Sequence, residues 1–339
     1  MLRRKAWALA AFLPFLVFGA TYPVAFGYQA GKDGVEIPVK SMVLDTFKQG
    51  AGPRFGKLEF LGGLVMATTG GELGAISSIR LLPDREHFIA IMDTGHWATG
   101  RIERDPQGRL SGIGTFAIHT MVPDTNSARQ DHESMDAEGM VLARDRIYVS
   151  FERDHRILAY PYPGFEDSAP VASERPVTGG VKLRGNGGIE ALLAAPADSA
   201  LAGSLFFVAE RTYDEKGNFV AGIHSGPLKG NFRVRRSGDY DVTDGVVLDD
   251  GTFLLLERKF GLKSGIGMRI RRFSIADVKP DALIDGEVLL EADFSHQIDN
   301  MEGLDAFRTD DGALHLIVTS DDNHSLLERN LMLEFKLLQ

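Results

Sequence analysis

The sequence contains five copies of one pattern, in which an acidic residue or a glycine precedes two apolar segments joined by a turn. A second acidic residue follows the apolar segments in each copy. The first positions of the copies are Gly74, Glu138, Glu190, Asp244 and Glu302. They recur every 52 to 64 residues, close to the length of one four-stranded blade of a β-propeller. The repeat therefore predicts an all-β fold built from successive blades.

Most copies continue into a third apolar segment, as expected for a blade of more than two strands. Residues 31–339 hold five to six units of this period. We predict one six-bladed β-propeller domain over residues 31–339, with the sixth blade built partly from residues 36–66 and closed against the last strand. Closing the ring of blades removes open sheet edges. The alternative is a β-sandwich of unrelated hairpins.

Residues 1–30 have the composition of an export signal. Arg3, Arg4 and Lys5 precede a mostly apolar stretch, which is the order found in signal peptides. If the stretch is not cleaved, it is nearly long enough to anchor the protein in a membrane. We therefore predict an exported protein, periplasmic or extracellular, that meets a membrane only through this segment.

Composition excludes several classes of function. The formal net charge of −10 argues against nucleic-acid binding, because phosphate recognition needs clustered lysine and arginine. The absence of cysteine excludes disulfides, thiolate metal ligands and a cysteine nucleophile. There is no Gly-x-Ser-x-Gly motif of serine hydrolases and no phosphate-binding loop. An acidic surface of this kind suits cations.

The two acidic positions of a copy are expected to lie side by side. Two antiparallel strands joined by a short turn begin and end at the same edge of a sheet. The expected pairs are Glu302 with Asp321, Glu138 with Glu152, Glu190 with Glu210, and Asp244 with Glu257, while Asp93 has no acidic partner. If these strands are the innermost ones of their blades, the carboxylates surround one mouth of the central channel.

Carboxylates this close disfavour joint ionisation unless a positive group compensates them. Oxygen ligands without cysteine fit a hard cation, and Ca²⁺ accepts many such ligands at irregular spacing. The candidate ligands are Glu138, Glu190, Asp244, Glu302, Asp321 and Asp93. The alternative is neutralisation by Arg153, Arg211 and Arg258, each of which directly follows a glutamate of the pattern. The glycines after Glu138, Asp244 and Glu302 are expected to adopt positive φ.

The segments "DNMEGL", "SDDN" and "LLERNLMLEFKLL", together with "GNGGIEAL", "FERDHRILAY" and "LLLERKFG", carry a family resemblance. They resemble the phytase-like family, described as "esterase-like activity of phytase" and found in exported bacterial proteins. The resemblance runs from about residue 70 to residue 338. It implies a β-propeller and hydrolysis of phosphate or carboxylate esters. The Asp-Ala-x-Asp-Pro-Ala motif of calcium-dependent propeller phytases is absent, which argues against phytate as substrate.

Four residues near the predicted mouth are candidates for catalysis. His155 and His324 follow acidic positions and could protonate a leaving group. Arg211 and Arg258 could bind phosphate oxygens through their guanidinium groups. The leading hypothesis is a Ca²⁺-dependent hydrolase of small phosphate monoesters or related esters. The alternatives are a lactonase-like metal-dependent ester hydrolase and a non-catalytic propeller that binds a ligand or protein and holds calcium for structure.

Overall fold

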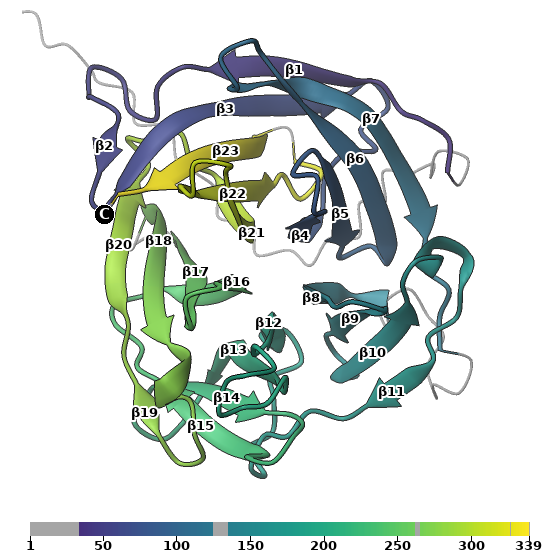
Figure 1. Ribbon diagram of the computed structural model, residues 1–339, viewed down its shortest axis with the longest axis vertical. Helices are drawn as coiled ribbons and strands as arrows, with labels where there is room; N and C mark the ends of the chain where they lie inside the picture. Colours follow the sequence, from purple (N-terminus) through teal and green to yellow (C-terminus); the bar gives the residue numbers. More distant parts are fainter. Residues whose placement is uncertain (1–33, 125–134, 262–264, 326, 339) are drawn as a thin grey trace, which may run out of the picture.

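The computed structural model describes residues 34–124, 135–261, 265–325 and 327–338. Within these ranges the chain forms five β-sheets arranged around a central axis (Figure 1). The all-β propeller prediction is confirmed. The predicted signal or anchor segment, residues 1–30, lies outside the described residues. Nowhere in the described ranges is there a helix with the length and apolar character needed to cross a bilayer.

Four of the sheets, or blades, each come from one continuous stretch of chain or nearly so. The first contains β4 (Ile76–Leu81), β5 (His87–Met92), β6 (His96–Arg104) and β7 (Leu110–Thr120). The second contains β8 (Ala137–Leu142), β9 (Arg146–Phe151), β10 (Arg156–Pro161) and β11 (Ala172–Glu174). The third contains β12 (Ile189–Ala194), β13 (Leu205–Tyr213), β14 (Phe219–Ile223), β15 (Gly230–Val234) and β19 (Leu283–Ile284). The fourth contains β16 (Asp241–Val247), β17 (Thr252–Gly261), β18 (Gly265–Ser274) and β20 (Glu287–Asp293). The described connections include the short 3-10 helices η2 (Phe165–Asp167) and η3 (Ile275–Asp277).

The fifth blade joins the two ends of the described chain. Its inner strands are β21 (Asn300–Arg308), β22 (Leu314–Asp321) and β23 (Asn330–Leu337). Its outer strands are β3 (Leu58–Thr68), β1 (Val39–Leu44) and the short β2 (Arg54–Phe55), which pairs with β3. In Figure 1 the yellow C-terminal strands lie beside the purple N-terminal ones. This pairing closes the ring.

The prediction of six blades is wrong, because the structure has five. Residues 36–66 do not start a blade of their own. They supply the outer strands that β23 needs at its free edge, with antiparallel pairing from Leu58 opposite Leu337 to Met66 opposite Asn330. The expected closure against the last strand is correct, and each of the five sequence copies corresponds to one blade.

Neighbouring blades are held together by apolar side chains between their sheets. Leu254 and Leu256 of β17, for example, belong to one buried cluster with Leu316 and Val318 of β22. These side chains are fully buried or nearly so. Burial of apolar area is the main favourable contribution to such packing. It fixes the innermost strands β4, β8, β12, β16 and β21 next to one another around the axis.

Each innermost strand contains a β-bulge close to its start. The register shifts fall between Ile76 and Ser78, Ala137 and Met140, Ile189 and Ala191, Val242 and Asp244, and Met301 and Gly303. A bulge adds one residue to a strand and changes the direction of a side chain. Three of the bulges contain the predicted acidic positions Glu138, Glu190 and Glu302.

The glycines after the acidic positions do not have positive φ, so that expectation is wrong. They are required by close packing instead. A Cβ on Gly139 would overlap the carbonyl oxygen of Glu190 on the neighbouring blade, and one on Gly303 would overlap the Thr319 hydroxyl. A Cβ on Gly245 would lie 2.9 Å from the Leu254 carbonyl oxygen.

Candidate metal centre

Eight carboxylates surround one end of the central axis, where the innermost strands begin. We call this group the carboxylate ring. Its members are Asp93, Asp136, Glu138, Glu152, Glu190, Glu210, Glu302 and Asp321. Each lies close enough to at least two others to affect their ionisation. They come from four of the five blades, and the fourth blade contributes none.

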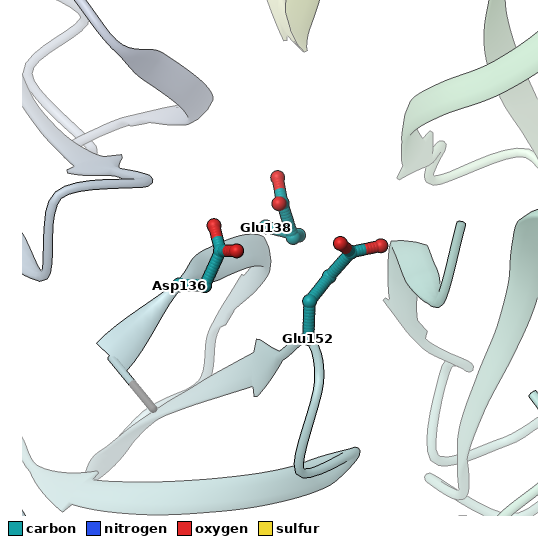
Figure 2. Close-up of side chains that lie close together, drawn as sticks. All are labelled: Asp136, Glu138 and Glu152. Carbon is teal, nitrogen blue, oxygen red and sulfur yellow. The ribbon is translucent and has the colours of Figure 1, made fainter. Parts of the chain in front are cut away.

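Two groups within the carboxylate ring have the spacing of a metal site. Asp136, Glu138 and Glu152 form the first group, and their side chains lie close together in Figure 2. Glu152, Glu190 and Glu210 form the second. In each group one oxygen per residue lies within 4.8 Å of the others. Glu152 belongs to both, so the two groups are continuous.

Backbone geometry holds Glu152 in place. Its Oε1 accepts hydrogen bonds from the amides of Gly187 and Gly188, each 2.6 Å long. These two amides belong to the loop that enters β12 on the next blade. Oε1 of Glu152 is thus held by two backbone amides. The other oxygen has no such bond and is available to a cation bound by either of the two groups.

Glu138 and Glu190 lack any such support. Within the described ranges, neither side chain has a hydrogen bond or an ion pair. Glu190 is nevertheless only 5% exposed. An ionised carboxylate that is buried without a partner is costly. Glu190 therefore requires either protonation or an added cation, and the half-buried Glu138 lies next to it.

The electrostatics of the ring agree with a missing positive charge. Burial raises the pKa of Glu138 well above its ordinary value, and Glu190 raises it further. Burial likewise raises the pKa of Glu190, with Glu210 and Glu152 adding to the effect. Burial, reinforced by Asp321 and Asp136, raises the pKa of Asp93 to about 8. A bound cation would reverse these shifts by favouring the ionised forms.

Glu302 and Asp321, the predicted pair of the fifth blade, are better compensated. Arg258 donates through Nη1 to Glu302 and to Asn300, and through Nη2 to Glu210 at 3.2 Å. Burial still raises the pKa of Glu302 to about 8. Asp321 accepts from the Ala75 amide and from the Asn323 amide at 2.8 Å, and burial raises its pKa to about 6.

The structure places Asp244 and Glu257 away from the carboxylate ring. Asp244 is fully buried, and both its oxygens bind Arg80 at 3.0 Å. It also accepts from Ser78 Oγ at 3.0 Å and from the Leu304 amide at 2.9 Å. These bonds leave it no free oxygen to offer a metal. Glu257 is held within its own sheet by Arg269 and Arg271.

The misplacement has a simple origin in strand register. In the fourth blade the bulge contains Thr243, and Asp244 is the residue after it. The partner of Asp241 at the start of β16 is Arg258, one residue beyond Glu257. The pattern of an acid followed by glycine therefore matched Asp244 to Glu302 of the fifth blade. The equivalent residue in the fourth blade is Thr243, one position earlier.

The four catalytic candidates lie around or beside the ring. His155 is next to Glu152, since both would contact a Cβ placed on Gly188. Burial lowers the pKa of His155, which keeps the imidazole neutral. His324 follows Asp321 and donates its amide to Asp322 Oδ1 at 3.0 Å. Arg211 pairs with Glu210 at 3.0 Å and Asp241 at 3.1 Å.

A pocket of about 430 Å³ lies beside His155, between the second and third blades. Its charged lining residues are Arg153, Arg175 and Lys182, and no acidic residue lines it. Arg153 also pairs with Asp136 of the carboxylate ring at 2.8 Å. The pocket, with its positively charged lining, therefore lies next to the negatively charged carboxylate ring.

Sequence reasoning named Glu152 and Glu210 only as partners, and it did not single out Asp136. Asp136 was detectable, because it lies directly opposite Glu152 at the start of the hairpin, where its carbonyl accepts the Glu152 amide. The sequence did not indicate that Arg80 binds Asp244, because the two residues are 164 positions apart.

Fold and site together define a five-bladed β-propeller with a buried, carboxylate-rich end of its axis. A sequence model of the Phytase-like family, "Esterase-like activity of phytase", matches residues 71–324. The chain belongs to this family, which confirms the resemblance found in its motifs.

Comparisons with individual proteins add little. A search of curated proteins found no match. Among solved structures, an endo-arabinase from Bacteroides thetaiotaomicron has 12% identity, with 77% of this chain and 94% of the other covered and a TM-score of 0.48. A PQQ-bound aldose sugar dehydrogenase from Streptomyces coelicolor has 14% identity, with 88% and 98% covered and a TM-score of 0.37. At these TM-scores neither likeness bears on function.

Proposed function

We propose that the protein is a Ca²⁺-dependent hydrolase of phosphate monoesters or related esters, with its centre at the carboxylate ring. The observation that carries this proposal is a pair of carboxylates without a hydrogen bond or ion pair to any described residue, the buried Glu190 and the half-buried Glu138, next to Glu152, which two backbone amides hold in place. The name of the family, which refers to esterase-like activity of phytase, supports the reaction class.

The residues present fit a hard divalent cation. The ligands available are carboxylate oxygens from Asp136, Glu138, Glu152, Glu190 and Glu210, and the chain has no cysteine. Oxygen donors of this kind favour Ca²⁺ over softer metals. When bound, Ca²⁺ would screen the charge of a phosphate ester and lower the pKa of a coordinated water.

The chain's own residues supply the remaining functions. Arg153 and Lys182, on the wall of the adjoining pocket, attract an anionic substrate that the carboxylates alone would repel. His155, neutral and next to Glu152, accepts or donates a proton at a ring nitrogen. Glu152, Glu190, Glu210 and Asp321 are buried, and electrostatic interactions are stronger in such surroundings than in water.

The test is an assay of phosphate and carboxylate esters, lactones included, with Ca²⁺ and with EDTA. We expect Ca²⁺-dependent hydrolysis that Glu190→Gln reduces more than about tenfold, as loss of a metal ligand should. The matched control is Glu215→Gln, an exposed glutamate in the turn before β14, which should leave activity unchanged. Turnover that persists in EDTA would contradict the proposal. Calcium binding without turnover of any ester would support the non-catalytic alternative.

We also propose that the protein acts outside the cytoplasm, where free Ca²⁺ is high enough for a site of modest affinity. The basic and then apolar order of residues 1–30 supports export. Cell fractionation and N-terminal sequencing of the full-length chain test this. Recovery of the intact chain from the cytosol would contradict it.

A further inference from the structure

Arg258 occupies the position in its blade that an acidic residue occupies in the other four. The equivalent residues are those that pair with the start of the innermost strand: Asp93, Glu152, Glu210, Arg258 and Asp321. The substitution of a cation for an acid at one of five equivalent positions breaks the symmetry of the ring.

The contacts of Arg258 show which carboxylates it pairs with. Its guanidinium bridges Glu302 of the fifth blade and Glu210 of the third, and it also binds Asn300. Its side chain is 18% exposed, and those of Glu302 and Glu210 are 12% and 3% exposed. A guanidinium buried between two acids is a strong and fixed counterion.

Among the residues that the structure describes, the other side of the ring has no comparable cation. Arg153 reaches Asp136 but is 43% exposed. Arg211 pairs with Glu210 at 3.0 Å and is 36% exposed. Glu138 and Glu190, which face this side, have no ion pair with any described residue. In direct contacts among the described residues, the ring is thus divided into one half that Arg258 pairs with and another half, around Glu138, Glu152 and Glu190, that has no buried arginine partner. Arg258 acts on Glu190 only at a distance, where it opposes the rise in the pKa of Glu190.

We propose that Arg258 is a built-in counterion that confines metal binding to the half of the ring formed by β8, β9, β12 and β13. It thereby sets how many cations the ring holds. This rests on the proposed calcium binding and adds to it a residue that positions the metal. Glu302 belongs to the ring, but it pairs with Arg258 and contributes no ligand to the metal. Glu210 lies at the boundary between the halves and is shared.

The experiment is calcium titration by calorimetry on the full-length protein and its variants. Arg258→Gln frees Glu302 and Glu210, so we expect one additional Ca²⁺ per chain relative to wild type. Arg211→Gln is the matched control, because it removes the other arginine partner of Glu210 and leaves the pair of Arg258 with Glu302 intact. It should leave the number of bound ions unchanged.

A second comparison does not depend on the folding of Arg258→Gln. Glu190→Gln should weaken Ca²⁺ binding at least about tenfold, whereas Glu302→Gln should change it less than about threefold. Equal weakening by both would overturn the assignment, as would an unchanged stoichiometry in folded Arg258→Gln. Failure of the calcium hypothesis itself is distinguishable, because wild type would then bind no Ca²⁺ at all.

Discussion

At the scale of single residues, the site depends on close backbone packing as much as on its acids. Gly139 follows Glu138 in the bulge of β8, and its Cα faces the Glu190 carbonyl of the next blade. Ser150 Oγ accepts the Gly139 amide at 2.9 Å and donates to the Ile189 carbonyl at 2.8 Å. This contact links the two strands that carry the unsupported glutamates.

We expect Gly139→Ala to destabilise the protein by about 1–3 kcal/mol, because the new methyl group overlaps backbone that cannot move freely. It should also weaken Ca²⁺ binding, since relief of the overlap shifts Glu190. Urea denaturation and calcium titration measure the two effects. The control is Gly52→Ala, where a Cβ has no neighbour within 4 Å. Equal stability of the two variants would contradict this account.

Glu190 shows how a binding site reduces stability. Buried without a partner, its charge disfavours the folded state when no metal is present. We therefore expect Glu190→Gln to be more stable than wild type in EDTA at pH 8, by about 1 kcal/mol or more. With Ca²⁺ added, the order should reverse. A variant that is less stable than wild type in EDTA would show that Glu190 has a structural partner.

At the scale of strands, one buried ion pair connects three blades. Arg80 of β4 binds both oxygens of Asp244 on β16 and donates to the Leu304 carbonyl on β21. It also donates to the Gly245 carbonyl at 2.9 Å. The Arg80 and Asp244 side chains are 8% and 0% exposed. Because β4 and β21 belong to the first and last blades, this clamp supports ring closure.

Removing one partner of the clamp leaves the other charge buried and alone. We expect Arg80→Met to destabilise the protein by about 3–5 kcal/mol, measured by urea denaturation in the presence of Ca²⁺. Arg85→Met is the control, because Arg85 pairs with Asp310 at 2.7 Å on the surface, where the Asp310 side chain is 93% exposed. An exposed pair of this kind contributes at most about 1 kcal/mol. Similar losses for both variants would contradict the clamp.

The same strands explain where sequence reasoning failed. Hairpin geometry was enough to bring Glu138 to Glu152 and Glu190 to Glu210, since it depends only on local strand pairing. It failed for Asp244 because the bulge in β16 falls on Thr243, and the sequence does not mark which residue is added. A shift of one residue moves a side chain to another face of a strand.

At the scale of the whole molecule, the repeat predicted the number of innermost hairpins but not the number of blades. Five copies correspond to five blades. Length alone suggested a sixth, because residues 36–66 contain strands that resemble the start of another unit. The longest of them, β3, pairs with β23, which lies 264 to 279 residues further along the chain. Pairing at such a distance depends on the closed ring and leaves no local pattern in the sequence.

The ring also makes stability depend on pH in a direction opposite to that of most ion-paired acids. Its carboxylates have pKa values above their ordinary range, about 8 for Asp93 and Glu302. Between about pH 4 and pH 8 these carboxylates therefore bind more protons in the folded chain than in the unfolded chain. Linkage then requires the free energy of unfolding to fall as pH rises through this window.

We expect the metal-free protein to lose stability from pH 5 to pH 8, and saturating Ca²⁺ to remove most of that loss. Bound Ca²⁺ favours the ionised carboxylates, so fewer protons are exchanged on unfolding, and binding to the folded state adds stability by mass action. Thermal denaturation at several pH values, in EDTA and in Ca²⁺, measures both effects. Mg²⁺ is the control for ionic strength, because its stricter octahedral geometry suits this irregular cluster poorly. If stability in EDTA rises from pH 5 to pH 8, the carboxylates are already compensated within the protein, and the case for a cation at the ring fails.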